Sequence, residues 1–156
     1  MPHVNDDIYL LLNHPDKLEQ AMALKLDGLD RHHVVHIFKN KYDNDIKQQA
    51  LGVKILDKWL LMDLIDIASP EELFYIIDHP KVDAEVLMFL WDKIVTNPTK
   101  NYYPLIQKFA YKKNLPESIQ KHIFQLYPEC IHGLMRNKDL SMWVINEILN
   151  NYKDFP

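Results

Sequence analysis

The sequence predicts an all-α fold, a short stack of antiparallel helix hairpins that forms one domain over residues 1–156. Apolar residues recur three and four positions apart along nearly the whole chain, which is typical of amphipathic helices, and no segment alternates apolar with polar residues as a half-buried strand would. Prolines and capping residues divide this pattern into nine or ten short helices. An irregular helical bundle is the alternative arrangement of the same helices.

A proline separates the first two predicted helices. Asn5 can cap a helix that runs to Leu12, because its side chain can accept a backbone N–H of the first turn. Pro15 then breaks the chain and suits the first position of a second helix, since its backbone angle is helical and its missing N–H is not needed there. Helical spacing places Leu18 and Met22 on the inner face of this second helix.

The helices that follow have clearer starts. Asp30 and Asp43 are placed to cap the next two, and the apolar segment 56–68 either forms its own helix or continues the preceding one. The clearest signal is Ser69-Pro70-Glu71-Glu72, in which a capping serine precedes a proline at the first helical position and a glutamate three residues on. This pattern predicts a capping box, in which both side chains bond free backbone amides.

Prolines and capping residues also divide the second half of the chain. The expected helix starts and breaks lie at Asp83, Asn97-Pro98, Tyr103-Pro104, Leu115-Pro116, Tyr127-Pro128 and Ser141.

Some of these signals recur along the chain. Pro70-Glu71 and Pro116-Glu117 lie 46 residues apart, a spacing near the ~40 to 47 residues of HEAT and armadillo units. Further matches are Ser69–Leu73, His79-Pro80, Val86, Thr96-Asn97-Pro98 and Arg136–Leu140. Through these strings the segment of about 67–150 resembles leucine-rich-repeat variants and their HEAT-like relatives. The resemblance implies a right-handed α-solenoid, a fold that mostly provides binding surfaces.

Composition excludes several function classes. The chain has three glycines, too few for the loops that cradle phosphate groups, and Cys130 is its one cysteine, so neither a disulfide nor a thiolate metal cluster can form within it. The net charge of −4 and the presence of only two arginines disfavour a nucleic-acid partner. No apolar run is long enough for a membrane span, so we expect a cytoplasmic protein without a membrane partner.

Two pairs of residues could carry chemistry. His32 and His36 lie one helical turn apart, as two metal ligands would, and Glu129 and His132 reproduce one of the two Glu-x-x-His steps of carboxylate-bridged di-iron sites. Either pair would suit a metal-dependent or hydrolytic enzyme. Neither has the further ligands that such a site needs, so the sequence assigns no catalytic residue, no metal ligand and no cofactor.

Acidic residues gather in the middle of the chain. Between Asp57 and Asp92 nine acidic residues and two lysines give a net charge of −7. Helical spacing combines these acids with large side chains in stripes on three successive helices. The predicted protein-binding residues are Trp59, Asp63, Asp66, Glu71, Tyr75, Asp78, Glu85 and Asp92.

The stripes predict a protein-binding module with a basic partner, if stacked helices align them into one surface. Aromatic anchors surrounded by complementary charge are typical of tight interfaces. An inhibitor or immunity-type protein that covers the nucleic-acid groove of a nuclease toxin would fit. The alternative is a scaffold or self-associating subunit, because the segment from Lys93 to Lys121 has six lysines and one glutamate, a net charge of +5. The oligomeric state is left open.

Overall fold

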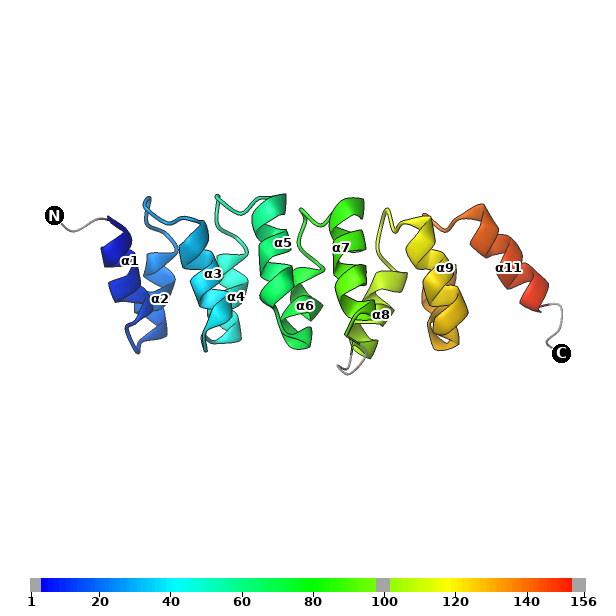
Figure 1. Cartoon of the computed structure of the whole chain (residues 1–156), viewed down its shortest axis with the longest axis horizontal. Helices are drawn as coiled ribbons and strands as arrows, with labels where there is room; N and C mark the ends of the chain where they lie inside the picture. Colours follow the sequence, from blue (N-terminus) through cyan, green and yellow to red (C-terminus); the bar gives the residue numbers. More distant parts are fainter. Residues whose placement is uncertain (1–3, 98–101, 153–156) are drawn as a thin grey trace. The chain divides into compact units, whose positions relative to one another are not determined.

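The computed structural model describes residues 4–97 and 102–152 (Figure 1). Within these ranges the chain forms eleven α-helices and one 3-10 helix and no β-strand, which confirms the all-α prediction and adds at least one helix to the expected number. None of the described helices could span a lipid bilayer. The chain divides into two compact units, the first ending at Lys81 and the second beginning at Val82.

The first unit contains two rows of helices (Figure 1). Its helices are α1 (Val4–Leu12), α2 (Lys17–Ala23), α3 (Arg31–Lys39), α4 (Asn44–Ala50), α5 (Lys58–Ile67) and α6 (Pro70–Ile76). Helix α3 contacts α5, and Tyr9 of α1 packs against His33 of α3, so α1, α3 and α5 form one row. Helix α2 contacts α4, and Lys47 of α4 bonds Glu72 of α6, so α2, α4 and α6 form the other.

Aliphatic side chains fill the space between the two rows. Those with less than 2% of their surface exposed are Ile8, Leu12, Ala23, Val34, Ile37, Ile46, Ala50, Leu56, Leu60, Leu61, Leu64, Ile65, Leu73, Ile76 and Ile77. Fully burying a leucine or isoleucine stabilises a fold by about 1.5–3 kcal/mol, so this core offsets much of the entropy lost when the short helices form.

The N-terminal helices depart from the predicted boundaries. Helix α1 begins at Val4, ahead of Asn5, whose side chain lies outside the described residues, and α2 begins at Lys17 with Asp16 as its cap rather than at Pro15. The inner-face prediction for α2 was wrong, because Leu18 and Met22 are 74% and 52% exposed. Helix α2 packs instead through its C-terminal end, where Ala23 and Leu24 are buried.

Of the two predicted caps of α3 and α4, the first makes its cap bond and the second does not. The Asp30 side chain accepts the His32 N–H at the start of α3, and Asp57 caps α5 as a separate helix, accepting the Leu60 N–H at 2.7 Å. Asp43 occupies the cap position of α4 without a side-chain cap bond, and its carboxylate lies 3.0 Å from the Lys17 ammonium instead.

Ser69 caps α6 as predicted, but the second half of the capping box was wrong. The Ser69 hydroxyl oxygen accepts the Glu72 N–H at 3.2 Å. The Glu72 carboxylate does not reach back to the Ser69 amide; its Oε1 accepts the Ser69 hydroxyl and the Lys47 ammonium, each at 3.2 Å. Glu72 is therefore a buried ion-pair partner that ties α6 to α4.

The second unit contains α7 (Ala84–Val95), α8 (Tyr103–Ala110), α9 (Glu117–Leu126), a 3-10 turn (Pro128–Cys130), α10 (Ile131–Met135) and α11 (Met142–Tyr152). Trp91 of α7 packs edge-on against Phe109 of α8 with ring centroids 5.2 Å apart. Its indole N–H donates to Nδ1 of His122 at 2.9 Å. The predicted break at Pro98 lies outside the described residues.

The helix starts give a shorter spacing than the Pro-Glu motifs. The capping residues Asp30, Asp57 and Asp83 lie 27 and 26 residues apart and precede α3, α5 and α7. Pro70 opens a short helix that follows α5 directly, whereas Pro116 ends the connection that leads from α8 into α9. The two Pro-Glu motifs therefore precede helices that are connected differently to the helix before them. The HEAT-like resemblance stays a prediction.

Candidate functional site

Helix α5 presents the clearest of the predicted surfaces. Trp59, Asp63 and Asp66 are all exposed on this one helix, and Trp59 keeps 59% of its surface accessible. The Lys58 ammonium lies 5.3 Å from the centroid of the Trp59 ring, a cation–π contact. The structure therefore brings these three predicted residues together as an exposed aromatic side chain beside two carboxylates.

An arginine from the neighbouring helix reaches this surface. The Arg31 guanidinium of α3 pairs with the Asp63 carboxylate and lies 3.8 Å from the Asp57 carboxylate. The Arg31 and Asp63 side chains are 51% and 58% exposed. Ion pairs this exposed contribute about 0–1 kcal/mol, so the charges on a partner protein can replace Arg31 at little cost.

The acidic stripe of α6 lies on the other row of the unit. Glu71 and Asp78 are exposed, but Asp78 lies in the turn after α6 rather than on the helix as predicted. Tyr75 is only partly exposed and its hydroxyl oxygen is buried. Burial, together with the Glu72 carboxylate, raises the pKa of the Tyr75 hydroxyl well above its ordinary value. Tyr75 is therefore a packing residue rather than an exposed anchor, and α6 does not extend the row that carries Trp59.

Glu85 and Asp92 lie on α7, in the second unit. Both side chains are exposed, and Met88 between them is 38% exposed. They form an acidic stripe on their own helix. The prediction that this stripe and the α5 stripe form one surface stays a prediction.

Two histidines of α3, His32 and His33, contact the residue that caps this helix. Nδ1 of His33 accepts the Asp30 N–H at 3.0 Å, and Nδ1 of His32 lies 2.7 Å from the Asp30 carboxylate. Polar atoms of these three residues come within 4.8 Å of one another. Helix capping uses two of these atoms, because Asp30 Oδ1 accepts the His32 N–H and Nδ1 of His33 accepts the Asp30 N–H. Nε2 of His36 bonds the Tyr42 hydroxyl at 3.2 Å, so His32 and His36 have separate partners.

Glu129 and His132 line a small cavity of about 200 Å³ in the second unit, beside Cys130. Both side chains are exposed, whereas Cys130 is buried. Burial, and secondly the Glu129 carboxylate, raises the pKa of the Cys130 thiol. The thiol therefore stays protonated at neutral pH, the opposite of what a nucleophilic cysteine requires.

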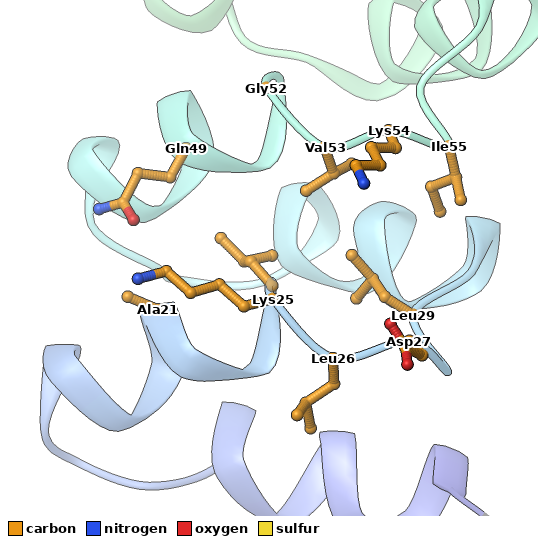
Figure 2. A pocket seen from close by; sticks show the side chains of 11 residues that line it. Ala21, Lys25, Leu26, Asp27, Leu29, Gln49, Gly52, Val53, Lys54 and Ile55 are labelled. Carbon is orange, nitrogen blue, oxygen red and sulfur yellow. The ribbon is translucent and has the colours of Figure 1, made fainter.

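A second cavity, in the first unit, was not predicted. It measures about 570 Å³ and lies in the first unit, between the connection that joins α2 to α3 (residues 24–30) and the one that joins α4 to α5 (residues 51–57) (Figure 2). Its walls are mostly aliphatic, with charged groups from Lys25, Asp27 and Lys54. A comparison of the two connections in the sequence could have located it, because each ends in Leu-Asp.

Comparison with protein-family models, with curated proteins and with solved structures finds no match to this chain.

Proposed function

We propose that this chain is a protein-binding module that docks onto a basic partner protein through the exposed face of α5. The observation that carries the proposal is Trp59, which keeps 59% of its surface exposed beside Asp63 and Asp66. Tryptophan is enriched among the residues that dominate interface energies, because a large rigid side chain buries much surface at a small entropic cost.

Charge supports a basic partner. The stretch from Asp57 to Asp92 has a net charge of −7, and the whole chain has −4. An acidic surface attracts a basic protein over about one Debye length, ~8–10 Å at physiological salt, which speeds association and makes it salt-dependent. The exposed Arg31–Asp63 ion pair can break, so that Asp63 pairs with an arginine or lysine of the partner instead.

An inhibitory role of the immunity type fits this surface. In this proposal the module covers the nucleic-acid groove of a basic nuclease, with carboxylates in place of phosphates. The architecture suited to it is a HEAT-like α-solenoid, in which helices of one row present a continuous face. The adjacent packing of α3 and α5 supports that arrangement within the first unit.

The test is affinity capture by the immobilised full chain at low and at high salt. We expect a basic protein to be retained at low salt and released at high salt. Trp59→Ala and the double variant Asp63→Lys/Asp66→Lys should each lose this protein, because they remove the anchor and invert the charge around it. Circular dichroism should show unchanged helicity in both variants.

Two matched variants serve as controls. Leu126→Ala changes a side chain that is 58% exposed in the second unit, and Asp45→Lys inverts an exposed carboxylate on α4 that pairs with Lys17. Both should capture as well as the wild type. If the Trp59 variant captures equally well, the α5 surface is not the docking site. A mass above the monomer by light scattering, without captured protein, would favour the self-associating alternative.

A further inference from the structure

Three connections of the chain share one backbone design. Helices α2, α4 and α6 have seven residues each, and each is followed by a seven-residue turn that ends in the capping aspartate of the next helix. The first turn comprises residues 24–30, the second 51–57, and the third begins at Ile77. Because the turns have equal length and the same backbone pattern, their residues correspond one to one.

The chain's own side chains close the junction between the second and third turns. Nε2 of His79 donates to the Leu51 carbonyl at 2.8 Å, and the Lys81 ammonium donates to the Leu56 carbonyl. Nδ1 of His79 accepts the Lys81 N–H at 3.0 Å, which leaves the ring proton on Nε2, where the bond to Leu51 needs it. An imidazole and an ammonium group thus satisfy two carbonyls of the preceding turn.

The second unit closes its corresponding junction in a similar way. The Asn137 amide, in the turn after α10, donates to the carbonyls of Ala110, the last residue of α8, and Lys112, in the turn after α8, both at 2.9 Å. A later turn therefore again reaches back to carbonyls of the earlier one. Such bonds to buried carbonyls stabilise a fold, because an unsatisfied carbonyl removed from water costs about 1–3 kcal/mol.

Within the part of the chain that the structure describes, no side chain of the second turn donates to a carbonyl of the first turn. The positions of His79 and Lys81 in the second turn are occupied by Val53 and Ile55, whose side chains have no hydrogen-bond donor. The carbonyls that correspond to Leu51 and Leu56 are those of Leu24 and Leu29. Both leucines line the cavity of about 570 Å³, and Figure 2 shows Val53 and Ile55 across it from Leu26 and Leu29. We refer to this cavity as the open junction.

We infer that the open junction binds a lysine side chain of the partner protein, in the place that Lys81 takes at the next junction. The ammonium group would donate to the Leu29 carbonyl, and the aliphatic stem would lie along Leu26, Val53 and Ile55. This inference rests on the proposed function, since the lysine is supplied by a protein partner.

The charges at the open junction define where the ammonium group can sit. Asp27 lies beside Leu29 in Figure 2, and the ammonium group of Lys25 lies on the far side of the cavity from it. Asp27 occupies the position that Lys54 has in the second turn, so the first turn carries a negative charge where the second carries a positive one. Lys25 and Lys54 repel any added ammonium group, so we expect the bound one at the Asp27 side of the cavity, away from Lys25.

The test is a titration of the full chain, followed by backbone amide chemical shifts, with the two probes N-acetyl-lysine methylamide and N-acetyl-norleucine methylamide. The lysine derivative should shift amides in the first and second turns with a dissociation constant on the order of millimolar, as expected for so small a ligand. The norleucine derivative has the same stem without the ammonium group and should bind more weakly. Equal shifts from both probes would overturn the lysine assignment.

Two variants test the geometry. Ile55→Lys places a lysine at the position of Lys81, so it should fill the open junction from within, abolish the shifts and leave the melting temperature equal or higher. Val95→Lys is the matched control, because Val95 is also a branched side chain with 38% exposure, and it should leave probe binding unchanged. Asp27→Asn should weaken the lysine probe and leave the norleucine probe as it is. Unchanged lysine binding in the Ile55 variant would overturn the inference.

The two proposals can fail separately. Probe titration reports on the open junction alone, whereas capture by the Trp59 and Asp63/Asp66 variants reports on the α5 surface. If the lysine probe does not bind but salt-dependent capture persists, the open junction has no role in recognition and the proposed function stands.

Discussion

The buried ion pair between Lys47 and Glu72 gives a sharp prediction about the first unit. The two side chains are only 10% and 11% exposed, and the ammonium nitrogen lies 3.2 Å from Oε1 of the carboxylate. Oε2 of Glu72 is also buried and has no hydrogen-bond partner among the described residues. Lys47→Met would leave this carboxylate with the Ser69 hydroxyl as its one side-chain donor, and Glu72→Gln would leave the ammonium group without its counter-charge.

Each single substitution should cost about 3–5 kcal/mol, because it leaves one buried charge uncompensated. With a denaturant slope of about 2 kcal/mol per molar, the urea midpoint should fall by roughly 2 M. The double variant Lys47→Met/Glu72→Leu replaces both charges with apolar groups of similar volume and should be more stable than either Lys47→Met or Glu72→Leu alone.

Urea denaturation followed by circular dichroism measures all of these free energies. Single variants that lose less than about 1 kcal/mol would show that the pair behaves like a surface pair. The packing of α6 against α4, from which the two rows of the first unit are inferred, would then be refuted.

Three further predictions concern individual residues. Asn137→Ala removes both carbonyl bonds between turns of the second unit and should lower the unfolding free energy by about 2 kcal/mol in urea denaturation. Gly133→Ala should cost about 1–3 kcal/mol in the same assay, because the added Cβ would lie 3.0 Å from Cβ of Ala110, whereas Gly52→Ala meets only a backbone oxygen at 3.4 Å and should be neutral or stabilising. Cys130 should react with a thiol reagent far more slowly at neutral pH in the folded chain than in denaturant, because burial raises the pKa of its thiol; equal rates would contradict its placement.

The local part of this structure could be predicted from sequence. Asp30 and Ser69 cap helices where the pattern indicated, because a cap depends on residues within one turn of the helix start. The separation of α4 from α5 was left open, since Asp57 is a capping residue in the middle of an apolar stretch and only the preceding turn shows that a helix has ended.

Contacts distant in sequence could not be predicted in the same way. The local pattern assigned Glu72 to its own helix end, but its carboxylate bonds Lys47, 25 residues earlier. Helical spacing likewise predicted an inner face for Leu18 and Met22, although the neighbours of α2 contact its other side. The Trp91 indole N–H likewise donates to His122, 31 residues later, whose side chain remains exposed. In each case the deciding partner lies on another helix.

If the open junction binds a partner's lysine as inferred, recognition and stability in this chain depend on the same few turn positions. A turn with hydrogen-bond donors at its third and fifth residues, as His79 and Lys81 provide, closes onto the carbonyls of the preceding turn and stabilises the stack. A turn with Val53 and Ile55 at those positions gives up these bonds and leaves a cavity. Because the backbone is the same in both cases, two side chains decide whether a junction holds the fold together or is available to a ligand. Donors at these positions therefore indicate a structural junction, and aliphatic side chains there indicate where a partner's donor can bind.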